Sequence, residues 1–177
     1  KGIDLMLGSM QMLKEINTHR MPFQLWLIGD GEDRQQITDD IKRKKIEDIV
    51  VLKGAQYGQD KIDLLQQAHL FLHPSRNEGM PTGVQEAASL GLPLVISEET
   101  NLGSYVAEYD AGWVLSENNS TNQVMAISKA MLLHYNNVLN KKEENAINMV
   151  ISEFNWAPIA QSLLQEYQQL LPNLKTV

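Results

Sequence analysis

Short apolar segments alternate with helix-like segments along the whole chain, and this alternation restricts the fold more than any other feature. Runs of apolar and β-branched residues predict strands at 23–29, 49–54, 70–74, 93–97 and 112–116. Helical periodicity predicts helices at 3–17, 32–45, 60–68, 83–91, 102–109, 119–135, 140–152 and 157–171. Short apolar strands separated by helices are typical of a parallel sheet with helices on both faces. We therefore expect an α/β fold.

Local signals predict where several helices begin. Asp60 is the expected N-cap of the third helix, and Ser120 or Thr121 is that of the sixth. Thr82, followed three residues later by Gln85, predicts a capping box at the start of the fourth helix. The last helix carries an apolar stripe that we expect to pack into the core, made of Ile159, Leu163, Leu164, Tyr167 and Leu170.

Composition excludes several classes of protein. A chain of 177 residues suits one domain with a real core. The net charge of −7 disfavours nucleic acid as a partner. Cysteine is absent, so disulfides and thiolate chemistry are impossible, and this fits a cytoplasmic location. No apolar run approaches the ~20 residues that span a bilayer.

The chain opens at Lys1 without a methionine, and we expect it to be a fragment of a larger protein.

Three candidate loops follow the first three predicted strands. They are the turn at 29–31, the segment 53–58 and the longer loop 74–83. The carboxyl ends of parallel strands meet at one edge of a sheet, and ligands of α/β proteins bind at that edge. The three loops therefore predict a binding site there. In this arrangement the backbone of Lys53, Gly54 and Ala55 is a candidate contact for the bound ligand.

The loop 74–83 and the helix after it carry two carboxylates, Glu78 and Glu86. Free amides at the helix start, from Met80, Thr82 and Gly83, would form an anion site. A long side chain on a helix leans toward the N-terminus, so Glu86 would aim its two acceptor oxygens at the same crevice, where they suit a vicinal diol. Glu78 would face the other end of the ligand. These features together describe a diphosphate with a sugar at each end. In the alternative interpretation, Glu86 is only an acid well placed near a helix N-terminus.

The segment 74–97, PSRNEGMPTGVQEAASLGLPLVIS, resembles the Glu-x7-Glu region of retaining glycosyltransferases of family four. KGIDLML at the start, LWLIGDGEDR at 25–34 and AGWVLS at 111–116 resemble further parts of that family, in the same order. The resemblance covers nearly the whole chain. It implies a two-domain GT-B enzyme in which residues 1–177 form the C-terminal, nucleotide-sugar-binding domain, with a Rossmann-like sheet. It also implies that the first strand of this domain and the acceptor-binding domain lie upstream.

The resemblance assigns roles position by position. Glu78 matches the catalytic glutamate, which contacts the transferred sugar, and Glu86 matches the glutamate that binds the ribose hydroxyls. Lys1 matches a lysine on the diphosphate. The segment whose backbone touches sugar and diphosphate matches Gly79, Met80, Pro81 and Thr82. Pro81 stands where glycine is common, and segment 97–113 departs from the family's G-G-x-P-E pattern, so the identity of the donor is left open.

Cofactors and partners follow from the same resemblance. Helix dipole and basic residues stabilise the leaving diphosphate in the family, so we expect neither a cofactor nor a metal ion, and Asp30 and Glu32 are not read as metal ligands. The expected partners are a nucleotide diphosphate sugar and an N-terminal acceptor domain, with peripheral membrane association through that domain. His73 is expected to be structural, and Arg76 to lie near the phosphates. Two alternatives stay open: a nucleotide-sugar epimerase of the same build, and a non-catalytic α/β binding module.

Overall fold

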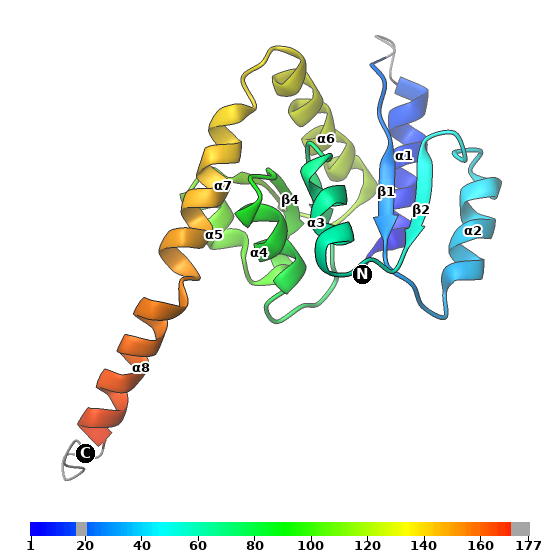
Figure 1. Ribbon diagram of the computed structural model, residues 1–177. Helices are drawn as coiled ribbons and strands as arrows, with labels where there is room; N and C mark the ends of the chain where they lie inside the picture. Colours follow the sequence, from blue (N-terminus) through cyan, green and yellow to red (C-terminus); the bar gives the residue numbers. More distant parts are fainter. Residues whose placement is uncertain (17–20, 171–177) are drawn as a thin grey trace.

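The computed structural model describes residues 1–16 and 21–170, and its elements alternate as expected (Figure 1). The strands are β1 (Leu25–Ile28), β2 (Val50–Gly54), β3 (Phe71–His73), β4 (Leu94–Ser97) and β5 (Gly112–Leu115). The helices are α1 (Ile3–Ile16), α2 (Arg34–Arg43), α3 (Gly58–Gln66), α4 (Thr82–Ser89), α5 (Gly103–Glu108), α6 (Ser120–Tyr135), α7 (Asn140–Glu153) and α8 (Trp156–Leu170). A short 3₁₀ turn, η1 (Glu98–Thr100), was not predicted. The last residues of the expected helices 3–17 and 157–171 lie outside the described residues.

All strand pairs in the described part of the chain are parallel, which confirms the α/β class. The strands do not form one sheet, however. β1 pairs with β2, and separately β4 pairs with β3 on one side and β5 on the other. Among the described residues, β1 and β3 are not hydrogen-bonded to each other, so the parallel strands form two separate ladders.

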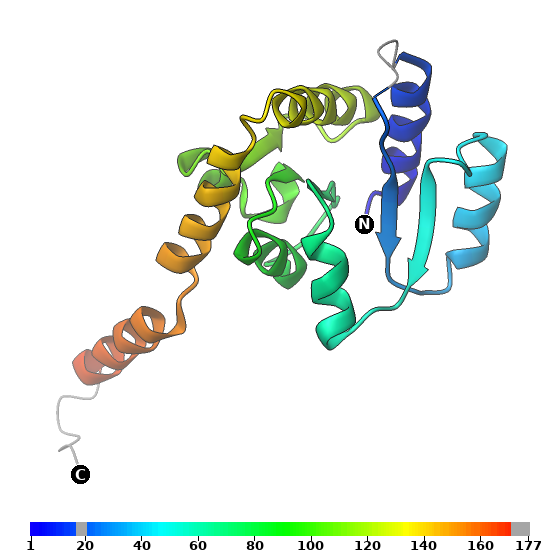
Figure 2. The same cartoon turned by 45° about the horizontal axis from the view of Figure 1, so that its top comes forward.

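Helices cover both faces of the strands, as predicted. Alternate residues of β4 turn to opposite faces. Leu94 and Ile96 pack in a cluster with buried residues of α4, α5 and α7, whereas Val95 packs with Ala126 of α6. Figures 1 and 2 show α6 on the side of the strands opposite to α4. A further cluster joins α1 and α6 to β2 and holds Leu7, Met10, Leu13, Val50, Val124 and Ile127.

The expected capping box at α4 is wrong. The helix begins at Thr82, the cap position belongs to Pro81, and no side chain caps it. Pro81 is extended, with φ −73° and ψ 107°, which its ring favours, and its carbonyl accepts from the amide of Val84. The first-turn amides of α4 are therefore free of competition from a capping hydroxyl.

Two other predicted caps are also wrong. Asp60 lies in the first turn of α3, and the cap position is Tyr57. At α6 the cap is Asn119, whose side chain accepts from the amide of Asn122 at 2.9 Å. Ser120 instead donates its hydroxyl to the carbonyl of Leu5 at 2.9 Å, so a tertiary contact replaces the local one.

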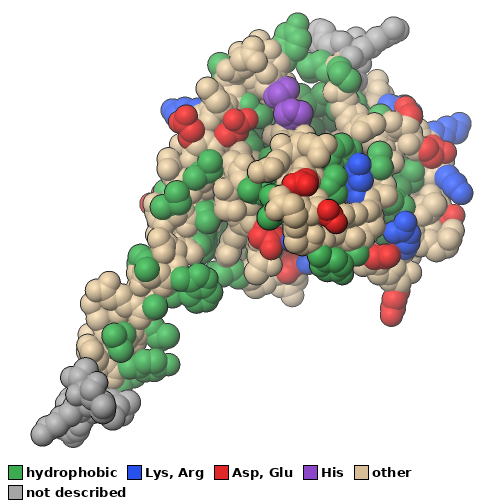
Figure 3. All heavy atoms as spheres, viewed as in Figure 1, with side chains coloured by type: hydrophobic (Ala, Val, Ile, Leu, Met, Phe, Trp, Pro, Cys, Tyr) green, Lys and Arg blue, Asp and Glu red, His purple; other side chains and the backbone are tan. Residues whose placement is uncertain are grey.

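The expectation that the last helix packs into the core is wrong as well. α8 extends away from the body of the domain, and none of its residues is buried (Figure 1). Its stripe, Ile159, Leu163, Leu164, Tyr167 and Leu170, is 42–73% exposed. Figure 3 shows hydrophobic side chains (green) along this helix. None of the helices in residues 1–16 and 21–170 is long and apolar enough to cross a membrane.

Candidate donor site at the carboxyl edge of the strands

Two of the three predicted loops touch directly. The amide of Gly29, just after β1, donates to the carbonyl of Gly54 at the end of β2, at 2.7 Å. Both glycines have positive φ, 141° and 70°, which L side chains rarely adopt. The loop that follows β3 lies at the same end of its own strand, so the carboxyl ends of the strands carry all three loops.

Polar side chains from two other elements hold the beginning of the loop after β3. Asn118 donates its side-chain amide to the carbonyls of Pro74 and Ser75, at 3.0 and 3.2 Å. The hydroxyl of Ser97, at the end of β4, also donates to Ser75. Pro74 and Ser75 are buried, so these bonds satisfy carbonyls that water cannot reach.

The turn after β4 holds the middle of the same loop. The amide of Glu78 donates to the carbonyl of Glu99 at 3.0 Å. Asn101 donates its side-chain amide to the carbonyls of Glu78 and Gly79, at 3.0 and 3.3 Å. Asn101 has φ 55°, a left-handed conformation that asparagine tolerates better than most residues. Sequence reasoning missed this residue, although an asparagine ahead of Leu-Gly was a usable turn signal.

The N-terminus of α4 offers backbone donors beside Glu78. The amides of Thr82 and Gly83 lie in the first turn, where a helix supplies no acceptor of its own. Gly79 has no heavy atom of another segment within 4 Å of the position a Cβ would take, so the loop faces open space. The side chain of Met80 is 59% exposed. An anion can approach the helix start from this side.

Glu78 is paired with the lysine that begins the sequence, 77 residues away. Lys1 donates its Nζ to Oε1 of Glu78. This hydrogen bond and the nearby positive charge lower the pKa of the Glu78 carboxyl below its ordinary value. Glu78 is therefore ionised at neutral pH. The pairing brings together two residues that the sequence analysis assigned to one site.

His73, at the end of β3, lies close to the side chain of Glu78. Its Nε2 is 3.8 Å from Oε1 of Glu78, is buried, and has no hydrogen-bond partner among the described residues. Burial, followed by the charge of Lys1, lowers the pKa of His73. The imidazole is therefore neutral at neutral pH. The expectation that His73 is only structural did not anticipate its place beside Glu78.

Glu86 is likewise paired with a lysine. Lys61 of α3 donates its Nζ to Oε2 of Glu86. The two side chains are 33% and 49% exposed, so the ion pair contributes little to stability. The sequence pattern did not predict the contact of Lys61 with Glu86, because α3 and α4 come together only in the folded chain.

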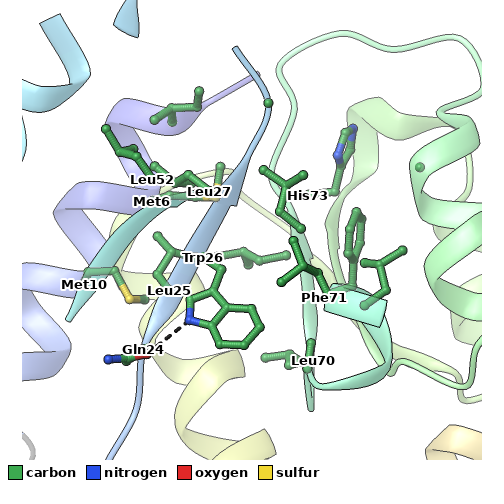
Figure 4. A pocket seen from close by; sticks show the side chains of 18 of the residues that line it. Met6, Met10, Gln24, Leu25, Trp26, Leu27, Leu52, Leu70, Phe71 and His73 are labelled. Carbon is green, nitrogen blue, oxygen red and sulfur yellow. Dashed lines mark hydrogen bonds between the residues drawn. The ribbon is translucent and has the colours of Figure 1, made fainter. Parts of the chain in front are cut away.

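A large cavity connects part of this site with the space between β1 and β3. Its lining includes Lys1, Glu78, Met80, Pro81 and Thr82 of the predicted site, together with Lys61. Its other walls come from β1 and β3, including Trp26, Leu27, Phe71 and His73 (Figure 4). Five predicted residues are not in the lining: Lys53, Gly54, Ala55, Gly79 and Glu86.

The side chains of two further predicted residues make contacts with other parts of the chain. Lys53 places its Nζ 4.1 Å from the ring centroid of Trp26, a cation–π contact. Arg76, expected near the phosphates, forms a two-pronged ion pair with Asp4 at 2.9 and 2.6 Å. Within residues 1–16 and 21–170, no three histidine or acidic side chains cluster in a way that could hold a metal ion.

Comparisons with known proteins identify the family and the fold of this chain. The family model described as glycosyl transferases group 1 matches residues 1–149. The amylovoran biosynthesis glycosyltransferase AmsK of Erwinia amylovora is 28% identical over 123 residues, which cover 66% of this chain and 30% of AmsK. The chain therefore spans less than half the length of this relative.

Solved structures share the fold. A crystal structure of S. aureus TarM in complex with UDP superimposes with a TM-score of 0.80 at 19% identity, covering 92% of this chain and 32% of TarM. The C-terminal domain of LpcC, a group 1 glycosyl transferase from Francisella tularensis, superimposes with a TM-score of 0.70 at 14% identity. That match covers 88% of this chain and 80% of the LpcC domain.

Proposed function

Because the chain belongs to the family of glycosyl transferases group 1, we propose that it is the donor-binding half of a hexosyltransferase. The whole enzyme would transfer a sugar from a nucleotide diphosphate sugar to an acceptor hydroxyl, with retention of the anomeric configuration, in polysaccharide or glycan biosynthesis. The acceptor would bind a separate N-terminal domain. A cytoplasmic location, with peripheral membrane association through that domain, belongs to the same proposal.

One observation carries the proposal: two lysine–glutamate pairs flank the open N-terminus of α4. Lys1 with Glu78 lies on the loop side, and Lys61 with Glu86 lies one turn inside the helix. The amides of Thr82 and Gly83 would receive the diphosphate, with Lys1 as its cation. Negative charge grows on the leaving diphosphate in the transition state, so donors fixed in advance at that point stabilise it.

The two glutamates would bind different parts of the donor. Glu86 would accept the ribose hydroxyls, and Glu78 would contact the transferred sugar. Lys1 would change partner from Glu78 to the diphosphate, which leaves the ionised Glu78 free to accept hydroxyls of the sugar or to stabilise positive charge near its anomeric carbon. The backbone of Gly79 to Thr82 would line the sugar and diphosphate, and that of Lys53 to Ala55 the base.

Calorimetric titration of UDP, GDP and their sugar conjugates into the protein tests this function. We expect micromolar to millimolar binding of at least one conjugate, unchanged by EDTA, because backbone amides and lysines would take the place of a metal ion. We also expect no sugar transfer by residues 1–177 alone. Failure of every nucleotide to bind would favour a non-catalytic module, and release of a free epimerised nucleotide sugar by the full-length protein would favour an epimerase.

A further inference from the structure

A second ion pair joins the two segments that carry Lys1 and Glu78. Arg76, two residues before Glu78, donates from Nη1 and Nη2 to the two carboxylate oxygens of Asp4, at 2.9 and 2.6 Å. A guanidinium and a carboxylate in this two-pronged arrangement hold one relative orientation. Asp4 lies in the first turn of α1, three residues after Lys1. The hydrogen bond with Arg76 lowers the pKa of the Asp4 carboxyl, so both groups are charged at neutral pH.

The backbones of the same two segments also approach each other closely. Gly2 has φ 71°, and a Cβ there would lie 2.1 Å from the carbonyl oxygen of Pro74. Glycine is the residue that tolerates both this conformation and this approach. The residues that lead into α1 and the loop after β3 therefore lie side by side. The way in which these two segments are held together fixes the position of Lys1 relative to Glu78.

The two ion pairs differ in their access to the cavity. Lys1 and Glu78 line it, whereas Asp4 and Arg76 do not. The side chains of Asp4 and Arg76 are 59% and 56% exposed, so this pair is in contact with water. A ligand in the cavity can therefore change the partner of Lys1 without displacing Arg76 from Asp4.

The Asp4–Arg76 pair is not what keeps α1 folded on the domain. Exposed ion pairs contribute little to global stability. α1 is held by its buried face, which includes Leu7, Met10 and Leu13, and by the hydroxyl of Ser120, which donates to the Leu5 carbonyl. The effect of the ion pair is therefore local, on the relative position of the two segments that it joins.

We propose that Asp4 and Arg76 are positioning residues for the donor site, whose ion pair keeps the start of α1 against the loop while Lys1 changes partner from Glu78 to the diphosphate. This inference rests on the proposed function for the role of Lys1. Without the pair, the start of α1 would be free to move away from the loop as Lys1 leaves Glu78. Ordering this segment again would then reduce the affinity for the donor.

Removing one charge at a time tests the proposal, because positioning and a direct charge effect predict different signs. A direct effect would strengthen the binding of an anionic nucleotide sugar in Asp4→Asn and weaken it in Arg76→Gln. Loss of positioning should instead weaken it by about three- to fivefold in both, and the double variant should lose no more than either single one. Loss of a favourable charge at the start of α1 would affect Asp4→Asn alone. Calorimetric titration with UDP-sugars and GDP-sugars measures these affinities.

The pKa of the Glu78 carboxyl is a second measurement, and it needs no ligand. The hydrogen bond with Lys1 lowers this pKa in the wild-type protein. If the ion pair positions Lys1, the pKa should rise toward its ordinary value in both Asp4→Asn and Arg76→Gln. A direct charge effect would lower it in Asp4→Asn and raise it in Arg76→Gln. NMR titration of the Glu78 carboxyl carbon measures the shift.

Asp40 and Arg43 of α2 provide the matched control. They form an ion pair of the same two residue types, at 2.6 Å, and do not line the cavity. Asp40→Asn and Arg43→Gln should leave the affinities within about 1.5-fold and the pKa of Glu78 unchanged.

Two results would overturn the proposal: pKa shifts of Glu78 in opposite directions in Asp4→Asn and Arg76→Gln, or no shift in either variant. If the wild-type protein bound no nucleotide while the pKa rose in both variants, the pair would still position Lys1 and only the proposed function would be rejected. The two proposals can therefore fail separately.

Discussion

Asn101 and Glu78 are joined by a hydrogen bond from the asparagine Nδ2 to the glutamate carbonyl, at 3.0 Å. The same Nδ2 reaches the carbonyl of Gly79 at 3.3 Å. The turn after β4 thus fixes the backbone of the loop that carries the proposed catalytic carboxylate. This turn lies in the segment that departs from the family's G-G-x-P-E pattern.

Asn101→Ala should destabilise the protein and weaken donor binding. It removes both hydrogen bonds, each worth about 1 kcal/mol, and places alanine in a left-handed conformation that costs about 1–2 kcal/mol. Urea unfolding should therefore show a loss of about 3–4 kcal/mol. Asn101→Gly is the matched control, because glycine accepts φ 55° but makes neither bond. If the glycine variant were as stable as wild type and bound nucleotide sugar equally, the bonds would have no positioning role.

Substitution of Glu86 and substitution of Glu78 should weaken the binding of different sets of ligands. Glu86→Ala removes the proposed ribose contact, worth about 1.5–3 kcal/mol, so the affinities for UDP or GDP and for its sugar conjugate should both fall at least about tenfold. Glu78→Ala should spare the bare nucleotide and weaken the conjugate, or reduce turnover in the full-length enzyme. Calorimetric titration measures both.

Glu99→Ala is the matched control for this pair. Glu99 is also a glutamate and lies beside Glu78. Its backbone carbonyl accepts the hydrogen bond from the Glu78 amide, and its side chain takes no part in that bond. Its removal should leave both affinities within about twofold, a change of roughly 0.4 kcal/mol. Equal losses in all three variants would indicate a general electrostatic effect instead of two specific contacts.

His73 should make the stability of the protein depend on pH. Its pKa in the folded chain is lowered from 6.5, mainly by burial. Between the folded pKa and 6.5, the unfolded chain binds more protons than the native one, so the free energy of unfolding rises with pH in this window. Stability should therefore fall as the pH drops below about 6.5. Urea midpoints at pH 7 and pH 5 should differ less in His73→Gln than in wild type. Identical pH slopes in the two proteins would contradict the assignment.

Gly112 should not tolerate a side chain. It pairs with Leu94 in the β4–β5 ladder, and a Cβ there would lie 2.0 Å from the Leu94 carbonyl oxygen. Gly112→Ala should cost at least about 1–3 kcal/mol, since backbone cannot move aside as a flexible side chain can. Gly31→Ala is the control, because no heavy atom lies within 4 Å of the position that a Cβ would take there. It should change the free energy of unfolding by less than about 0.5 kcal/mol. Thermal or urea unfolding of both variants measures these changes in the free energy of unfolding.

The kinds of element were predictable because periodicity is a local property of the sequence. The same pattern carries no information on which strands are neighbours, so the separation of β1 from β3 could not be read from it. The predicted caps were wrong for a related reason. Ser120 has the right chemistry for a cap, but its hydroxyl donates to the carbonyl of Leu5 in the folded chain.

The candidate site was predictable where its residues are close in sequence. Glu78 and Thr82 belong to one loop and helix start, and both line the predicted crevice. Lys61 could not be found, since its contact with Glu86 depends on how α3 packs beside α4. His73 was visible as a residue at a strand end, but its unpaired Nε2 is a consequence of burial.

The exposed helix α8 has a thermodynamic consequence. Helices of about 12–15 residues without tertiary contacts are marginal in water, and α8 has 15 residues, none of them buried. We therefore expect α8 to exchange between helical and unfolded conformations, because packing against the core of this domain does not stabilise the helix. Any surface that covers its apolar stripe must supply the free energy of ordering the helix, so docking and helix formation there are one coupled transition.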